Sequence, residues 1–256
     1  MTLRAEGLTL GYDGRRVIEG LDLSFPGGEM VTILGPNGCG KSTLLRALGR
    51  LLRPEAGRVT LDGDDLFALN SRAVARRMAI LPQSPLAPEG ITVADLVRRG
   101  RLPWRGLLSP WSAADRIACA EAIEVVRLST EATRPIEELS GGQRQRAWIA
   151  LVLAQDTSLL LLDEPTTFLD LTHQIEVLRL LRERNRQTGL SVISVLHDLN
   201  LAARFSDRLV LLGSGGLVAE GSPDTVLTAP NLGRAFGLKA EIHPDPVSGA
   251  PMVFPL

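Results

Sequence analysis

Residues 35–42 read Gly35-Pro36-Asn37-Gly38-Cys39-Gly40-Lys41-Ser42, directly after the short apolar run Met30–Leu34 and before residues whose apolar side chains have helical spacing. The octapeptide fits the pattern G-x-x-x-x-G-K-[ST], whose glycines let backbone N–H groups surround phosphate oxygens at a helix N-terminus. In this pattern the Lys41 ammonium reaches the β- and γ-phosphates, and the Ser42 hydroxyl is a ligand of Mg²⁺. A glycine-rich turn with a solvated lysine is the alternative, and the flanking strand and helix argue against it. The sequence therefore predicts a buried strand, a phosphate-binding loop and a helix, in that order.

A second apolar run ends in two carboxylates. Leu159–Leu162 predicts a buried strand, and Asp163 and Glu164 follow at its carboxyl end, the side on which ligands bind in open α/β sheets. There Asp163 would hold the metal, directly or through water, and Glu164 would polarise an attacking water as a general base. A strand that simply ends in an acidic turn would look the same in isolation, so this prediction depends on the phosphate loop.

The rest of the chain predicts an α/β fold with a parallel sheet. Strands and helices alternate after Leu159, an order typical of parallel strands joined by helical crossovers. The N-terminal part is β-rich instead, with a hairpin turn at Asp13-Gly14. From about residue 84 to residue 155 the sequence is mostly helical, which predicts a helical subdomain inserted into the core. The expected elements are strands Leu3–Tyr12, Val17–Phe25, Arg58–Leu61 and Ser191–Leu196, helices Thr92–Arg99, Ser112–Val126, Gly142–Leu153, Leu171–Thr188 and Leu199–Phe205, and a closing hairpin of Arg208–Gly213 and Leu217–Gly221.

Composition excludes several classes of protein. The 256 residues include 28 basic and 29 acidic side chains, a formal net charge of −1, and this balance disfavours nucleic acid as a partner. Only two of the basic residues are lysines, Lys41 and Lys239, and the two cysteines, Cys39 and Cys119, do not make a disulfide framework. No apolar run approaches the roughly 18–20 residues that cross a bilayer, and the N-terminus lacks the apolar core of a secretory signal. We therefore expect a soluble, intracellular globular protein.

A second candidate anion site lies at Leu139-Ser140-Gly141-Gly142-Gln143, before another predicted helix. Alone, this stretch is an ordinary helix N-cap followed by flexible glycines. A phosphate that is already held elsewhere would nevertheless find free N–H groups at this helix start. Two such helix starts and one carboxylate pair indicate that nucleotide is sandwiched between two copies of the chain.

Together these motifs resemble those of the ATP-binding cassette ATPases. Ser140-Gly141-Gly142-Gln143 resembles the signature motif of that family, Gln83 its Q-loop glutamine and Phe168-Leu169-Asp170 its D-loop. His197 resembles the switch histidine, and Tyr12 resembles the aromatic residue that stacks on adenine. Taken alone, Gln83 would be a loop residue, His197 a capping or core histidine and Tyr12 a packing residue. The family order of all these motifs favours the functional interpretation.

The resemblance implies a P-loop NTPase core with a RecA-like parallel sheet, an antiparallel β-subdomain and the helical insertion, in a single nucleotide-binding domain over residues 1–256. It implies ATP and Mg²⁺ as cofactors and ATP hydrolysis as the activity. The implied catalytic residues are Glu164, His197 and Gln83, and the implied Mg²⁺ ligands are Ser42, Gln83 and Asp163. The implied ATP-binding residues are Tyr12, Gly35, Pro36, Asn37, Gly38, Cys39, Gly40, Lys41, Ser42, Thr43, Ser140, Gly141, Gly142, Gln143 and Asp170.

Cys39 raises a separate question because it lies inside the phosphate loop. A helix N-terminus and the nearby Lys41 can lower the pKa of a thiol. The alternative is a small residue that the loop merely tolerates. If the thiol is reactive, its alkylation should block nucleotide binding.

A narrower resemblance connects the chain to the ATPases of ferric-siderophore importers, with haem and vitamin B12 importers as close relatives. It rests on Gln83-Ser84-Pro85, on the segment from Gly90 to Arg101, and on residues 166–174, which read Thr-Thr-Phe-Leu-Asp-Leu-Thr-His-Gln. It implies a head-to-tail dimer that docks on integral-membrane permease subunits at the cytoplasmic side of the inner membrane. A substrate-binding protein would be an indirect partner, and nucleic acid would not be one.

The helical segment also carries a group of arginines and tryptophans that are favoured residue types at interface centres. We expect this group to contact the membrane subunits, and a solvated basic face is the alternative. Its members are Arg98, Arg99, Arg101, Trp104, Arg105 and Trp111.

Other members of the same family act as clamps on ribosomes or DNA, or serve exporters. A single cassette, the lack of heptad repeats and the net charge disfavour a clamp. Residues 166–174 disfavour an exporter.

Overall fold

The computed structural model describes residues 1–12, 14–106, 109–167 and 169–256. Within these residues the centre is a six-stranded sheet in the order β10-β9-β3-β8-β7-β6, parallel except for β10. Every residue of β3, β7 and β8 is buried, which explains why these strands are continuous apolar runs. The strands are β3 Met30–Leu34, β6 Met78–Leu81, β7 Leu159–Asp163, β8 Ser191–Val195, β9 Arg208–Gly213 and β10 Gly216–Gly221.

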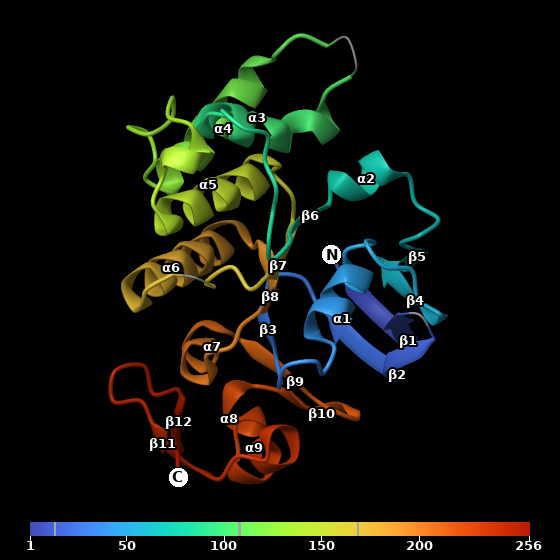
Figure 1. The fold of residues 1–256 in the computed structure, drawn as a ribbon. Coiled ribbons are helices and arrows are strands. Elements are labelled where there is room, and N and C mark those ends of the chain that lie inside the picture. The colour runs from blue at the N-terminus through green and yellow to red at the C-terminus, as the bar shows by residue number, and fades with distance from the viewer. Residues whose placement is uncertain (13, 107–108, 168) are drawn as a thin grey trace.

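A smaller antiparallel sheet lies beside the first helix, on the right of Figure 1. Its order is β2-β1-β4-β5, and its inward side chains pack with α1 and with β3 and β7 in one hydrophobic cluster. From Gly20 to Phe25, buried residues of β2 alternate with exposed or partly exposed ones, as expected for a strand with one solvated face. The elements are β1 Leu3–Tyr12, β2 Arg15–Phe25, β4 Ala56–Leu61, β5 Asp64–Asp65 and α1 Lys41–Leu48.

The helical segment lies above the central sheet in Figure 1. Its helices α3, α4 and α5 pack on one another and, through a second hydrophobic cluster, on β7 and α6. Side-chain caps fix where α3, α4 and α5 begin, with capping boxes at α4 and α5. The elements are α3 Val93–Arg98, α4 Ala113–Val125 and α5 Gly141–Ala154, with short 3₁₀ helices at Arg99–Trp104 and Ile136–Glu138.

The remaining elements cover the outer parts of the sheet and form the C-terminal tail. A third hydrophobic cluster joins the tail to α7 and β9. No helix among the described residues is both long and apolar enough to span a membrane. The elements are α2 Ser71–Ala75, α6 Leu171–Thr188, α7 Leu199–Phe205, α8 Pro223–Val226, α9 Ala229–Phe236, β11 Ala240–Pro244 and β12 Pro251–Pro255.

Most predicted elements are confirmed, with boundaries that differ by at most two residues. Elements without a counterpart in the prediction are the short strands β5 and β6, the helices α2, α8 and α9, and the strands β11 and β12. β6 has only four residues and no alternation, so its pattern is too short to identify from sequence. Asp13 in the predicted hairpin turn and Phe168 in the predicted D-loop lie outside the described residues.

Candidate nucleotide-binding site

The phosphate loop joins β3 to α1 and has the backbone that the motif requires. Gly35, Gly38 and Gly40 have φ values of 152°, 78° and 103°, which side chains rarely tolerate. A Cβ at Gly35 would also lie 2.5 Å from the Leu212 carbonyl oxygen. Gly40 is the N-cap of α1 and provides no side-chain cap, so the first N–H groups of this helix remain available to an anion.

Lys41 points back over this loop rather than into solvent. Its side chain is buried, and its Nζ donates to the carbonyl oxygens of Gly35 and Pro36, both at 2.9 Å. The ammonium is therefore held at the centre of the loop, close to where the motif places phosphate.

The carboxyl ends of three neighbouring parallel strands supply the other polar side chains. Gln83 follows β6 and His197 follows β8. Between them, β7 ends at Asp163, and Glu164 is the next residue. Glu164 is the hub, because its Oε2 accepts from Gln83 Nε2 at 2.7 Å and from Thr167 Oγ1 at 2.8 Å. Its other oxygen, Oε1, lies 2.6 Å from His197 Nε2. The structure thus brings together the three residues that the resemblance implies are catalytic.

The surroundings of Glu164 favour its charged form. Burial disfavours the carboxylate, but hydrogen bonds from His197 and Thr167, together with the charge of His197, outweigh it and lower the pKa of Glu164. Its backbone has a φ of 52°, so the chain leaves the extended conformation directly after Asp163. Because side chains alternate only in an extended strand, this turn lets both carboxylates reach the same end of the sheet.

Asp163 and Ser42 form the pair that could hold a cation. Ser42 Oγ donates to Asp163 Oδ1 at 2.9 Å. Burial and the neighbouring charge of Glu164 raise the pKa of Asp163, although the hydrogen bond from Ser42 opposes this shift. A hydroxyl and a carboxylate are oxygen donors of the kind that Mg²⁺ accepts from proteins alongside phosphate and water. The residues present therefore fit Mg²⁺.

The stretch Ser140–Gln143 begins α5 and is already capped within the chain. The Ser140 hydroxyl accepts from Gln143 N at 3.2 Å, and the Gln143 side chain accepts from Ser140 N at 3.1 Å. Among the described residues, no hydrogen bond joins this helix start to the phosphate loop. The two predicted anion sites are thus separate features of one chain.

Asp170 and Tyr12 belong to elements other than the strand ends that carry Gln83, Asp163, Glu164 and His197. Asp170 is the N-cap of α6, and backbone and side-chain hydrogen bonds from His173 lower its pKa. Tyr12 ends β1 with 42% of its surface exposed, so its ring remains free to stack on a planar group.

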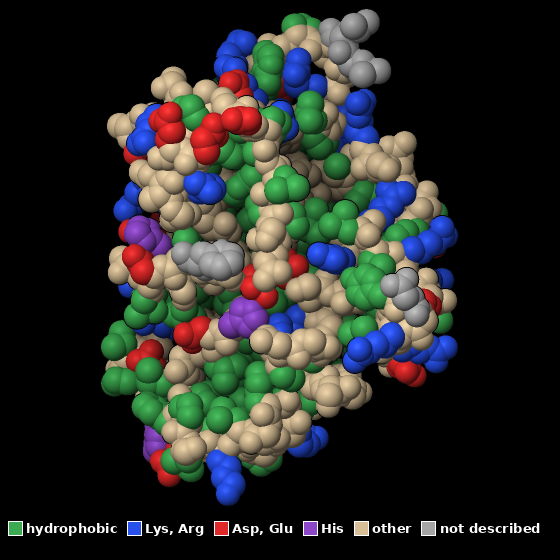
Figure 2. Space-filling model, viewed as in Figure 1, with side chains coloured by type: hydrophobic (Ala, Val, Ile, Leu, Met, Phe, Trp, Pro, Cys, Tyr) green, Lys and Arg blue, Asp and Glu red, His purple; other side chains and the backbone are tan. Residues whose placement is uncertain are grey.

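At Cys39, burial raises the pKa of the thiol despite the opposing charge of Lys41, which favours the alternative of a small residue that the loop tolerates. One expectation from sequence, concerning Arg101, needs correction. Arg101 does not belong to an exposed basic face, because it is buried against Asp115 with Nε 3.0 Å from Oδ1. Arg98 and Arg99 are exposed, and Figure 2 shows basic side chains over the helical segment interspersed with acidic and hydrophobic ones.

The sequence reasoning missed two contact residues. Thr167 donates to Glu164, and the ring of His173 packs so closely on the signature stretch that a Cβ at Gly142 would lie 3.1 Å from it. Both belong to residues 166–174, which the sequence analysis used only to identify a subfamily. No local pattern distinguishes their contacts from those of ordinary loop residues.

Comparison with known proteins agrees with this geometry. A family described as ABC transporter matches residues 18–167. The achromobactin transport ATP-binding protein CbrD of Dickeya dadantii is 50% identical, covering 97% of this chain and 92% of its own length. The ferric enterobactin transport ATP-binding protein FepC of Escherichia coli is 48% identical over 99% of this chain and 94% of its own. The hemin import ATP-binding protein HmuV of Rhodococcus jostii is 42% identical over 100% of this chain and 86% of its own.

Two solved structures share the fold. A metal-chelate type ABC transporter in an inward-facing conformation has a TM-score of 0.86 at 29% identity, covering 100% of this chain and 97% of that one. An ATP-binding cassette solved as a dimer with ADP and Pi has a TM-score of 0.75 at 28% identity, covering 86% of this chain and 98% of that one.

The fold and the phosphate loop therefore define a P-loop protein of the ATP-binding cassette class. More narrowly, the chain belongs to the ABC transporter family.

Proposed function

We propose that this chain is the ATP-binding subunit of an ABC importer and hydrolyses ATP to drive uptake of ferric-siderophore complexes through a membrane permease. The observation that carries the ATPase assignment is the Glu164 carboxylate, held between Gln83, Thr167 and His197. The names of the relatives at 48–50% identity support the choice of a siderophore cargo.

In this proposal the phosphate loop binds the nucleotide, and Tyr12 stacks on its adenine. Lys41 exchanges its two carbonyl acceptors for β- and γ-phosphate oxygens. Ser42, Asp163 and Gln83 would hold Mg²⁺, which would supply positive charge to neutralise the phosphates.

Glu164 then accepts the proton of the attacking water, since its lowered pKa keeps it ionised at neutral pH. His197 lies 2.6 Å from the same carboxylate, which suits it to orient that group and to contact the γ-phosphate.

The separation of Ser140–Gln143 from the phosphate loop supports a head-to-tail dimer. In such a dimer each ATP lies between Lys41 of one copy and Ser140 and Gly142 of the other, and both sites are equivalent. Asp170 lies beside the same junction through His173, which contacts Gly142. The solved dimer with 28% identity is a precedent for two cassettes in one assembly.

The further partners belong to the same proposal. Residues 1–256 act as one nucleotide-binding domain, peripheral to the cytoplasmic side of the inner membrane, and the helical subdomain at about 84–155 docks on permease subunits. A substrate-binding protein delivers the cargo outside, and nucleic acid is not a partner.

Haem is the second candidate cargo, favoured by the hemin import relative at 42% identity, and vitamin B12 is a third. Reconstitution of the chain with its permease in vesicles distinguishes them. We expect ATP-dependent uptake of a ferric catecholate or hydroxamate complex, with no uptake by Glu164→Gln vesicles. If only haemin or only cobalamin is taken up, the siderophore assignment is wrong and that compound is the cargo. If the chain hydrolyses ATP but assembles with no permease, a non-transport clamp is favoured.

A further inference from the structure

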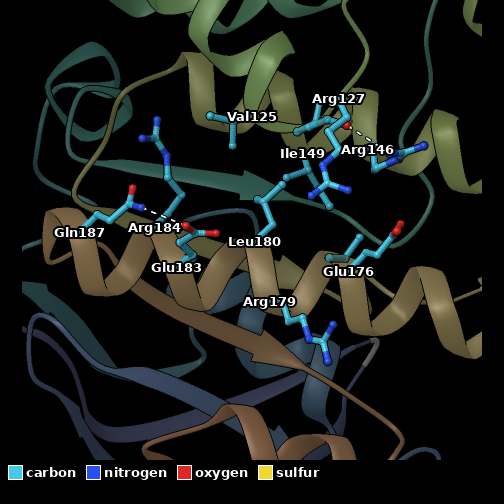
Figure 3. Close-up of a pocket in the computed structure, with 12 residues that line it drawn as sticks. Val125, Arg127, Arg146, Ile149, Glu176, Arg179, Leu180, Glu183, Arg184 and Gln187 are labelled. Carbon is cyan, nitrogen blue, oxygen red and sulfur yellow. Dashed lines mark hydrogen bonds between the residues drawn. The ribbon is translucent and has the colours of Figure 1, made fainter.

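A cavity lies between the end of α4, the helix α5 and the helix α6 (Figure 3). Its volume is about 400 Å³, within the range of small-molecule sites. Ile149, Val177 and Leu180 form an apolar base. None of its lining residues belongs to the nucleotide site, so the cavity requires an explanation of its own.

The rim of this cavity is arginine-rich. Arg127 and Arg146 enter from the α4–α5 side and Arg184 enters from α6, whereas the Arg179 side chain extends from α6 away from α4 and α5. Within the described part of the chain, none of these four side chains forms an ion pair with a carboxylate. Glu176 and Glu183 also line the cavity, so the three arginines that face it and the two glutamates leave a net charge of one positive unit.

Arg146 is incompletely satisfied. Its Nη1 donates to the Val126 carbonyl oxygen at 3.3 Å, whereas its buried Nε has no acceptor among the described residues. A buried donor without an acceptor is costly, because it has lost water and gained nothing in return. An anion at this guanidinium would supply the charge partner that the protein does not.

Arg127 occupies a backbone position at which glycine is the usual residue. It follows α4 with a φ of 57°, and Leu128 N donates to Ile123 O as in a Schellman motif. An arginine at this left-handed position is strained relative to glycine. In Figure 3 its side chain extends from the end of α4 toward α6, over Leu180. The strain therefore accompanies a guanidinium placed over the cavity.

We propose that this cavity binds a small oxyanion with two or more negative charges, such as a polyphosphate or a polycarboxylate. The arginine forks match carboxylate and phosphate oxygens, and the apolar base accommodates a short carbon skeleton. The bound ligand connects the end of α4 to α6, and so ties the helical segment to the core. This site is independent of the proposed transport function.

Titration calorimetry of the intact chain with inorganic pyrophosphate and, separately, with citrate tests the site. Saturating ADP in magnesium-free buffer keeps the phosphate loop occupied, because both probes would chelate Mg²⁺, and the two probes distinguish phosphate from carboxylate chemistry. Arg127→Gly is the decisive variant, because glycine suits the backbone there and the fold should be retained. We expect saturable binding of at least one probe, weakened roughly five- to tenfold in this variant, as for loss of one charge-assisted contact.

Two matched variants make the result specific. Arg50→Gly is the control, because Arg50 also has a positive φ, of 63°, but does not line the cavity. Its affinity for the probe should equal that of the wild type, and Glu176→Gln should bind more tightly because a repelling charge is removed. The proposal fails if neither probe saturates, if Arg127→Gly binds as tightly as the wild type, or if Arg50→Gly weakens binding equally.

Discussion

At the scale of single residues, the central feature is the Glu164 carboxylate, both of whose oxygens contact neighbouring side chains. Gln83, Thr167 and His197 reach Glu164 from three different segments, so its orientation does not depend on its own rotamer alone. The same contacts lower its pKa, whereas burial raises that of the adjacent Asp163. The two neighbouring carboxylates therefore have different surroundings, with hydrogen-bond donors dominating at Glu164 and burial dominating at Asp163.

The first prediction concerns this carboxylate. Glu164→Gln keeps the hydrogen-bonding shape but removes the base, so we expect retained ATP affinity and hydrolysis slowed by roughly 10²–10⁴-fold. Nucleotide titration and steady-state phosphate release measure the two quantities. Glu124→Gln on the exposed side of α4 is the control, and near wild-type turnover of Glu164→Gln would exclude the assigned role.

The second prediction concerns Arg101, whose role the sequence did not reveal. Its guanidinium binds Asp115 and donates to the Ala154 carbonyl oxygen at 2.8 Å, so it connects the 3₁₀ helix at Arg99–Trp104 with α4 and α5. Removing one partner of a buried pair leaves the other charge uncompensated, and Arg101→Ala should lower the free energy of unfolding by about 3–5 kcal/mol. The double variant Arg101→Met/Asp115→Asn should recover much of that loss in urea unfolding. Equal losses in both variants would show that the charge pair is not the cause.

At the scale of secondary-structure elements, a strand or helix could be predicted from sequence where a motif fixes its position or where complete burial makes it a continuous apolar run. β3, the phosphate loop and α1 were predictable because the motif fixes their order, and β7 because a fully buried strand is a continuous apolar run. β6 was not predictable, although it places Gln83, because four apolar residues give no period. Contacts between distant segments, such as Thr167 with Glu164 or His173 with Gly142, depend on tertiary packing and leave no local pattern.

The third prediction concerns the link between α6 and the central sheet. Asp207 accepts from Arg182 Nη1 and Nη2, both at 2.6 Å, and from Met30 N at 2.8 Å. Burial opposes the charged form, but these hydrogen bonds prevail and lower the pKa of Asp207. In the unfolded chain the pKa of an aspartate is about 3.9. Because folding lowers the pKa of Asp207, its charge stabilises the folded state at pH values above about 3.9, and this stability is lost as the pH falls toward the pKa of the folded state.

Urea unfolding across pH tests this link. The free energy of unfolding of Asp207→Asn should lie below that of the wild type at pH 7, and the two should converge as the pH falls below about 4. Asp224→Asn on the exposed start of α8 is the control. A difference that stays constant with pH would mean that the charge of Asp207 contributes nothing.

At the scale of the whole molecule, the central sheet and the helical segment carry different parts of the proposed nucleotide site. The nucleotide residues lie at strand ends and in the loop after β3, whereas Ser140–Gln143 begins a helix of the upper segment (Figure 1). In the proposed mechanism these two stretches are half-sites of different nucleotide sites, and no hydrogen bond joins them among the described residues. This arrangement makes a second copy a requirement of the proposed mechanism rather than an addition to it.

The fourth prediction concerns the exposed arginines of the helical segment. Arg98 and Arg99 are exposed and lie beside exposed Leu102 and Trp104, a mixed surface suited to a protein partner. Reversing both charges with Arg98→Glu/Arg99→Glu should impair assembly with the permease and transport while leaving ATP affinity unchanged. Arg116→Glu on the exposed face of α4 is the control in co-purification and nucleotide titration. Wild-type assembly by the double variant would exclude this surface from docking.

The position of Lys41 has a practical consequence, because it shares the chain with only one other lysine, Lys239. Lys239 is exposed between α9 and β11, whereas Lys41 is buried and bonded to two carbonyls. An amine-reactive reagent should therefore modify Lys239 and the N-terminus readily and Lys41 slowly. In a mass spectrum of the digested protein, the Lys41 adduct can be divided by the Lys239 adduct, which is the reference. This ratio measures how often the phosphate loop opens, and it needs no engineered label.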